Sequence, residues 1–319
     1  MPAIFSHSAY QPLIVLLFAV ALDVLWRWPA STHPMTLLRY LAQQMRKKVC
    51  PTPHDPPLQH TISGSLGAFM LIVPVVVTIG MLIYMAQYPF FFEALVMACV
   101  LDFHQVRYQY QLVLRTVGQD KKMLARERVS GLVARDCSRL TDIGIAKAAI
   151  EALLLKFYYL YCGVIFWFMV AGPVAALVYR MVLELAWQWN TRQPGLGRFG
   201  RPVRQLAIWT RTVPAFLAAT LMLLVTSPLS GIRAARQANQ KDTTSLLLAL
   251  FAGSHGFRLG GPAYYADHKI RGLRVGGQRD VRYSDMIYSQ RAIYRAMVLV
   301  VTISSLLLWL VAELSPPGG

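Results

Sequence analysis

Hydrophobic runs separated by polar, basic segments make up most of the sequence. A helix that crosses the hydrocarbon core of a bilayer needs about 20 mostly apolar residues, because its backbone polar groups have to be bonded within the helix. Several of the runs reach this length or come close to it. We therefore predict an all-α, polytopic integral membrane helical bundle of about five to six spans, at approximately 11–27, 66–88, 89–103, 159–187, 206–226 and 294–312.

Two of these runs have a second interpretation. The first resembles a secretory signal, but its leading ten residues contain no Lys or Arg and no small-residue cleavage site closes it. We therefore interpret it as a retained helix. Segment 89–103 is short and begins at Pro89, which makes it either the return leg of a hairpin or a re-entrant helix.

Basic residues set the expected orientation of the spans. Cytoplasmic loops of membrane proteins are rich in Lys and Arg, and segments 28–64, 104–156 and 227–293 carry most of these residues. We predict that these three segments are the cytoplasmic regions of a multi-pass protein of the bacterial inner membrane. Loop 188–205 falls on the outer side although it holds four arginines, so we interpret it as a segment lying against anionic headgroups.

The cytoplasmic regions differ in their apolar pattern. In 104–156, apolar residues recur at three- and four-residue steps, which predicts a helix pair that includes residues 132–150. Region 227–293 is richer in Gly and Tyr and predicts irregular structure with one short apolar helix, Leu246–Phe251. Neither region shows sustained strand alternation.

Composition narrows the class of protein. Of 319 residues, 55% are hydrophobic and 15% are charged, and the formal net charge is +17. This balance excludes a disordered chain, a coiled coil and a small disulfide scaffold. Nucleic-acid binding would explain the charge but not the apolar runs, so we expect a lipid bilayer and no nucleic acid as partner. The four cysteines form no CxxC pair and the seven histidines no HExxH motif, so we expect no metal site.

Three short motifs have both a chemical and a structural interpretation. Residues 195–200 match GxGxxG, but they follow a predicted membrane span and a proline, so we interpret the match as accidental. The turn at Gly260-Gly261-Pro262 either directs backbone N–H groups at an anion beside Arg258, or seats a loop on the membrane. In Arg135-Asp136, Asp136 is a candidate helix N-cap and Arg135 a solvated charge.

Together these segments resemble, in collinear order from about residue 13 to about 275, the CobD/CbiB membrane proteins of cobalamin biosynthesis. The resemblance begins at Asp23, Pro29 and His33-Pro34 and continues through Ala125-Arg126 and 132–137. It includes Glu151, the aromatic triplet 166–168, Gly172-Pro173, Tyr179, Phe199-Gly200 and Val213-Pro214-Ala215. The most specific block is 256–265, GFRLGGPAYY.

The resemblance implies a function. The family ligates aminopropanol phosphate to a side-chain carboxylate of adenosylcobyric acid, a corrinoid, with ATP and Mg²⁺, and yields adenosylcobinamide phosphate. The chain is thus expected to be an adenosylcobinamide-phosphate synthase-type ligase, with Glu151 and Asp23 as the remaining family carboxylates for Mg²⁺. We assign no catalytic residue and no resident metal; the candidates for substrate and phosphate binding are Arg135, Asp136, Glu151, Asp23, His33, Arg258, Gly260, Gly261, Tyr264 and Tyr265.

The departures from the family pattern suggest an alternative. Acidic and amide residues of the family are replaced by Leu155-Lys156, Tyr158-Tyr159-Leu160, 183–187 and Ala207-Ile208. A carboxylate at membrane depth is costly and persists where it has a purpose. The Leu/aromatic run 153–161 and the closing helix 291–310 resemble the AmpE-like branch of inner-membrane regulators. The alternative is therefore a pseudoenzyme, a non-catalytic signal transducer of that kind.

Overall fold

The computed structural model describes residues 10–29, 31–52, 54–237, 242–265 and 268–314. It confirms the helical class, and five helical stretches are long and apolar enough to cross a membrane. The chain divides into two compact units, described separately below. Unit 1 comprises Met1–Asp102, Gly163–Arg211 and Val301–Gly319, and unit 2 comprises Phe103–Cys162 and Thr212–Val300. The expected single family domain over 1–319 stays a prediction.

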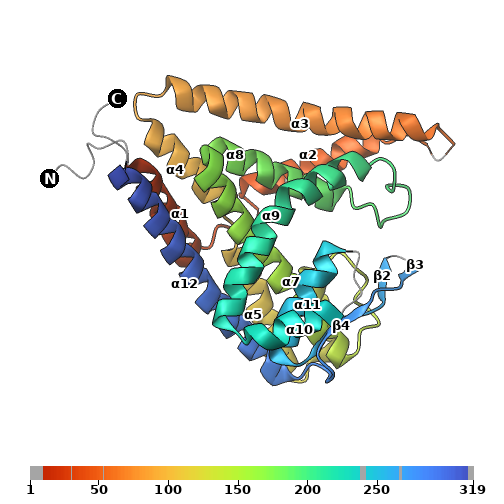
Figure 1. The fold of residues 1–319 in the computed structure, drawn as a ribbon. Helices are drawn as coiled ribbons and strands as arrows, with labels where there is room; N and C mark the ends of the chain where they lie inside the picture. The colour runs from red at the N-terminus through yellow and green to blue at the C-terminus, as the bar shows by residue number, and fades with distance from the viewer. Residues whose placement is uncertain (1–9, 30, 53, 238–241, 266–267, 315–319) are drawn as a thin grey trace. The chain divides into compact units, whose positions relative to one another are not determined.

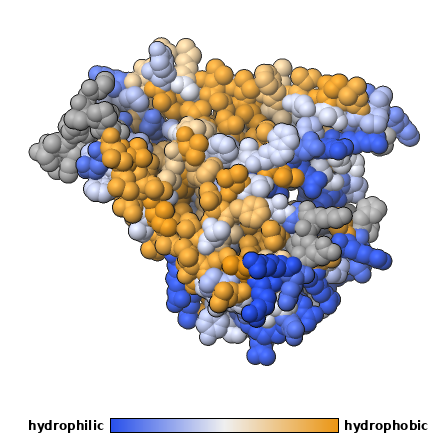
Figure 2. Space-filling view, viewed as in Figure 1, coloured by the Kyte–Doolittle hydropathy of each residue, from blue (hydrophilic) through white to orange (hydrophobic). Residues whose placement is uncertain are grey.

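Several helices of unit 1 have a proline in their first turn, where the missing N–H of proline leaves no group unbonded. Proline stands at the beginning of three of them, and His33 caps one by accepting the Met35 N–H on its Nδ1 at 3.1 Å. Figure 1 shows these helices, and Figure 2 shows hydrophobic side chains along α3. The helices are α1 (Gln11–Leu25), α2 (Pro34–Val49), α3 (Pro57–Met85), α4 (Pro89–Val100), α8 (Gly163–Gln188), the first part of α9 (Arg201–Val225) and the end of α12 (Tyr283–Leu314).

The GxGxxG match lies in the turns between α8 and α9 and is a packing element. Leu196 and Phe199 are buried, and the Phe199 ring meets Trp189 edge-on with the centroids 4.9 Å apart. The indole N–H of Trp189 donates to the Ala42 carbonyl of α2 at 3.0 Å. This loop therefore joins α2 to α8 by burying aromatic surface, as the accidental interpretation predicts.

Two glycines of α3 give a matched test of this packing. A Cβ on Gly64 would collide with the Phe199 carbonyl oxygen, whereas a Cβ on Gly80 would meet nothing within 4 Å. We expect Gly64→Ala to lower the unfolding temperature. Gly80→Ala should raise stability by up to about 1 kcal/mol, because alanine is the better helix former. Thermal unfolding in detergent measures both, and equal effects of the two changes would contradict the packing described.

Unit 2 has a helical core and a small irregular sheet region (Figure 1). In η3, a π-helical segment, Phe157 stacks on Tyr161 with centroids 5.9 Å apart, and Phe103 packs against both rings. The elements are α5 (His104–Gly118), α6 (Lys122–Ser130), α7 (Asp142–Lys156), η3 (Phe157–Cys162), the rest of α9, α10 (Pro228–Gln237), α11 (Thr243–His255), β1 (Arg258–Gly260), β2 (Ala263–Tyr265), β3 (His268–Ile270), β4 (Arg274–Gly276) and the start of α12.

Two sequence expectations for unit 2 were wrong in detail. The apolar pattern at 132–140 does not form helix: these residues lie in a loop, and α7 begins after Thr141, whose hydroxyl accepts the Gly144 N–H at 3.2 Å. The region expected to be irregular contains α10, a longer α11 and four strands of three residues each. Such strands are too short to show alternation, and β1 and β4 both end on a glycine with positive φ.

Candidate functional site

One carboxylate, Glu151 of α7, joins three segments of unit 2. Its Oε2 accepts from Arg135 Nη2 at 3.0 Å, and its Oε1 accepts the Gly260 N–H at 2.7 Å. The side chains of Arg135 and Glu151 are 14% and 12% exposed. This arrangement, called the Glu151 clamp below, ties the loop after α6 and the strand β1 to α7. Arg135 is therefore not the solvated charge that the sequence suggested.

A second tie holds the same loop to the hairpin of β2 and β3. The Asp136 N–H donates to the Tyr264 carbonyl at 2.8 Å. The Asp136 side chain accepts the Ser138 N–H at 2.9 Å, and this hydrogen bond holds the pKa of Asp136 below its usual value. Asp136 thus stabilises a turn, and the N-cap of α7 is Thr141 instead.

The glycine pair before Pro262 has its N–H groups bonded within the protein. Gly260 donates to Glu151, and Gly261 donates to the Leu273 carbonyl at 3.1 Å. Both residues have positive φ, 72° and 119°, a backbone region that favours glycine. A Cβ on Gly260 would also collide with the Leu273 carbonyl oxygen. The pair therefore makes a tight turn whose N–H groups bind protein acceptors.

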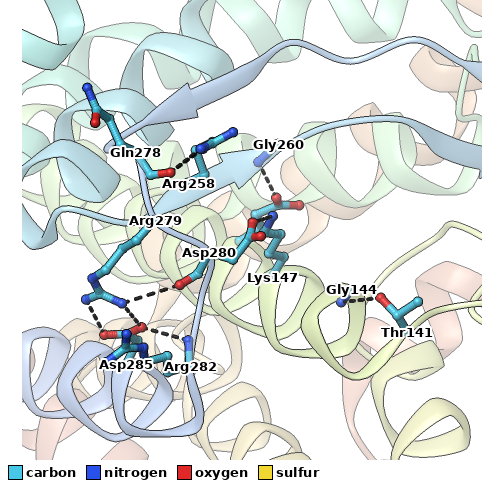
Figure 3. A network of polar contacts seen from close by, with 11 residues as sticks. Thr141, Gly144, Lys147, Arg258, Gly260, Gln278, Arg279, Asp280, Arg282 and Asp285 are labelled. Carbon is cyan, nitrogen blue, oxygen red and sulfur yellow. Dashed lines mark hydrogen bonds and ion pairs between the residues drawn. The ribbon is translucent and has the colours of Figure 1, made fainter.

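Charged side chains lie near Gly260, among them Lys147, Arg258 and Asp280 (Figure 3). Lys147 of α7 pairs with Asp280, Nζ to Oδ1 2.8 Å, and the Arg258 guanidinium donates to the Gln278 carbonyl. The hydrogen bond and charge of Lys147, with the charges of Arg258 and Arg274, hold the pKa of Asp280 below its usual value. Sequence reasoning missed Lys147, although its spacing of four residues from Glu151 predicts a shared helix face.

The loop that carries Asp280 is anchored at the residue before it, Arg279. Arg279 makes a bidentate ion pair with Asp285 at the start of α12, with N···O distances of 2.5 and 2.7 Å. Asp285 also accepts the Arg282 N–H at 2.8 Å. The carboxylate of Asp285 raises the pKa of Arg279, so this pair stays ionised at neutral pH.

Two of the ten candidate residues lie in unit 1. Asp23 of α1 and His33 before α2 are both buried. The His33 Nε2 faces Asp102 at 3.7 Å, and burial lowers the pKa of His33, so its imidazole is neutral at pH 7. The structure brings the other eight candidates together in unit 2: Arg135, Asp136, Glu151, Arg258, Gly260, Gly261, Tyr264 and Tyr265.

Unit 1 also contains a buried charge cluster of three residues. Glu184 of α8 accepts from Arg39 Nε at 2.6 Å and from Arg180 Nη1 at 2.8 Å. Arg180 and Glu184 are buried, whereas the Arg39 side chain is 35% exposed. We call these three residues the Arg–Glu–Arg cluster. It joins α2 to α8 through ions rather than through apolar contacts.

The described carboxylates do not form a ready-made site for a resident Mg²⁺ ion. Within the described ranges, no three His, Cys, Asp or Glu residues lie close enough to hold a metal. A Mg²⁺ site needs carboxylate oxygens that are available to the ion. In unit 2, Glu151, Asp280 and Asp285 are each paired with a cation.

Comparison with known proteins gives a consistent result. The family model described as CobD/Cbib protein matches residues 16–312. The Cobalamin biosynthesis protein CobD of Chromobacterium violaceum is 25% identical over 259 residues, which cover 79% of this chain and 82% of that protein.

Further relatives match over shorter segments. The protein of the same name from Stutzerimonas stutzeri is 34% identical over 144 residues, 44% of this chain and 48% of that protein. The one from Brucella suis is 27% identical over 209 residues, 61% of this chain and 63% of that protein. No solved structure matches the chain significantly. Because the family model covers nearly its whole length, the chain belongs to the CobD/Cbib protein family.

Proposed function

We propose that this chain acts in cobalamin biosynthesis at the bacterial inner membrane, where it joins aminopropanol phosphate to adenosylcobyric acid through an amide bond. The observation that carries the proposal is the convergence in unit 2 of residues from three distant segments, linked by the Glu151 clamp and by the bond from Asp136 to Tyr264. The linked residues Arg135, Glu151 and Gly260 come from three of the segments that resemble the cobalamin family, and all three lie in unit 2.

The proposed reaction is a ligation driven by ATP. The γ-phosphoryl group passes to the corrin carboxylate and ADP leaves; the amine of aminopropanol phosphate then displaces phosphate and forms the amide. The demand on the protein is to position these reactants and to stabilise phosphate charge with cations. Arg258 is half-buried beside the turn, where it donates to the Gln278 carbonyl, and supplies one such charge. We route no step through Mg²⁺, because the described residues contain no group of three possible metal ligands.

Growth rescue tests this proposal in the cell. The chain is expressed in a cobalamin auxotroph that lacks only its adenosylcobinamide-phosphate synthase and that receives cobyric acid. We expect growth, with cobinamide phosphate detected by mass spectrometry. Absence of growth while immunoblots show the full-length chain in the membrane fraction would refute the ligase.

A specific observation favours the second candidate function, a non-catalytic AmpE-like regulator. In η3, Tyr158-Tyr159-Leu160 replace a stretch in which the family has an acidic residue, and all three side chains are buried. This candidate predicts no measurable affinity for ATP or for corrinoids. A micromolar dissociation constant for either would count against it.

A further inference from the structure

We propose that Lys147, Arg258 and Arg274 form a binding site for the phosphate group of a small organic phosphate, and that Asp280 occupies this site until the ligand displaces it. These three cations are called the basic cluster below. The inference deepens the proposed function and rests on it for the role of the bound phosphate in ligation. Binding itself is measured without turnover.

The short β1–β4 ribbon places two of the three cations. Leu259 pairs with Val275 in the antiparallel register, and both side chains are buried. Since side chains alternate along a strand, Arg258 and Arg274 lie on the opposite, outer side of the ribbon. Each arginine is opposite a glycine, Gly276 for Arg258 and Gly260 for Arg274, so no side chain stands between them.

The third cation reaches the ribbon from α7. Lys147 is 14% exposed and meets Asp280, which is 57% exposed. Its place on α7 is fixed one turn further along by the Glu151 clamp, which bonds the ribbon at Gly260. Lys147 is therefore held at the ribbon by the same helix that fixes the turn.

The charges of this site do not balance. Lys147, Arg258 and Arg274 all act on the single carboxylate of Asp280. The neighbouring carboxylate, Glu151, is neutralised by Arg135, and Arg279 is neutralised by Asp285. Three cations against one carboxylate leave an excess of two positive charges. A phosphate monoester carries up to two negative charges at neutral pH and accepts several hydrogen bonds, so its charge and chemistry fit the excess.

Arg274 is the cation most available to a ligand. It is exposed, and in the described part of the chain its guanidinium has no hydrogen-bonding partner. Part of the hydrogen-bonding capacity of Arg258 is already used, because its guanidinium donates to the Gln278 carbonyl. Asp280 is the group that a phosphate would replace, since a carboxylate and a phosphate compete for the same cations. It is exposed and held by one ion pair, so it can leave without exposing apolar core.

The test measures phosphate binding to the full chain in phosphatidylcholine nanodiscs by calorimetry, with O-phosphoethanolamine and inorganic phosphate as probes. We expect Asp280→Asn to bind O-phosphoethanolamine about five- to tenfold more tightly than the unchanged chain, because the competing carboxylate is gone. Arg274→Gln should bind it about tenfold more weakly. Affinity should rise from pH 5 to pH 7, as the phosphate becomes a dianion.

Arg271→Gln is the matched control. Arg271 is exposed and basic and lies close to Arg274 in the chain, but outside the basic cluster. We expect its affinity for O-phosphoethanolamine to be unchanged. An equal loss in Arg271→Gln and Arg274→Gln would show general charge attraction and overturn the inference. So would an Asp280→Asn variant that binds no more tightly than the unchanged chain.

A lipid headgroup is the other source of the same chemistry. Repeating the titrations with phosphatidylglycerol in the nanodisc separates the two sources. If phosphatidylglycerol weakens the binding of O-phosphoethanolamine to the unchanged chain but not to Arg274→Gln, the site binds the lipid headgroup. If the affinity of the unchanged chain is the same in both lipids, the site binds the free molecule.

Failure of the inference can be told apart from failure of the proposed function. If the variants change the affinity for O-phosphoethanolamine as expected but the chain does not restore growth, the phosphate site is supported and the ligase function is refuted. If Arg274→Gln and Asp280→Asn restore growth as fast as the unchanged chain and bind O-phosphoethanolamine with the same affinity, the phosphate site is refuted and the ligase function is supported.

Discussion

Replacing Glu151 by glutamine is expected to lower the free energy of unfolding by about 3 kcal/mol, because it leaves Arg135 largely buried without its counter-charge. The glutamine oxygen can still accept the Gly260 N–H, so the effect isolates the lost ion pair. SDS-induced unfolding followed by tryptophan fluorescence measures the change. Growth rescue should fall in parallel, since the Glu151 clamp holds the turn that carries Arg258.

Glu127→Gln is the control for this experiment. Glu127 is exposed on α6, and its replacement by glutamine removes the same charge from the same unit. Its stability should change by less than about 0.5 kcal/mol, as is usual for surface substitutions. A Glu151→Gln variant as stable as Glu127→Gln would contradict the clamp. Full growth rescue by Glu151→Gln would show that the Glu151 clamp is irrelevant to function.

Replacing Glu184 by alanine should have a still larger effect, about 4 kcal/mol or failure to accumulate in the membrane. The change leaves the guanidinium of Arg180, which is wholly buried, without its carboxylate, and Arg39 loses its partner as well. An uncompensated buried charge is among the most destabilising defects known in proteins. Membrane yield and SDS-induced unfolding report the effect.

A triple substitution controls for the loss of packing. Changing Arg39, Arg180 and Glu184 together to methionine removes every charge of the Arg–Glu–Arg cluster and keeps similar volume. Buried ion clusters replaced in this way are often as stable as before. We therefore expect the triple variant to be more stable than Glu184→Ala. If it is equally unstable, packing rather than unpaired charge explains the single-residue effect.

The helical membrane class could be predicted from the sequence because long apolar runs have few alternatives in a bilayer. The shorter elements could not. Residues 132–140 have helical periodicity, yet Gly131 follows α6 and the Thr141 cap begins α7 afresh. The strands β1 and β4 depend on pairing across 16 residues and on glycines with positive φ, and neither feature appears in a local pattern.

The candidate site, too, could be predicted from the sequence only in part. Family resemblance pointed to Arg135, Glu151 and Gly260, but it gave no hint that they bond one another. Lys147 and Asp280 are 133 positions apart, and a local pattern does not predict their pairing. The resemblance also grouped Asp23 and His33 with residues that the fold places in another unit. Tertiary pairing of charges is the information that the sequence pattern lacks.

The central claim is that the chain forms the amide bond itself. The most direct test incubates the purified chain in nanodiscs with adenosylcobyric acid, aminopropanol phosphate, ATP and Mg²⁺, and measures adenosylcobinamide phosphate by mass spectrometry. We predict product that accumulates with time and falls when Glu151 is replaced by glutamine. If a nanodisc sample that binds O-phosphoethanolamine forms no product, while an active synthase does so under the same conditions, the ligase account is contradicted.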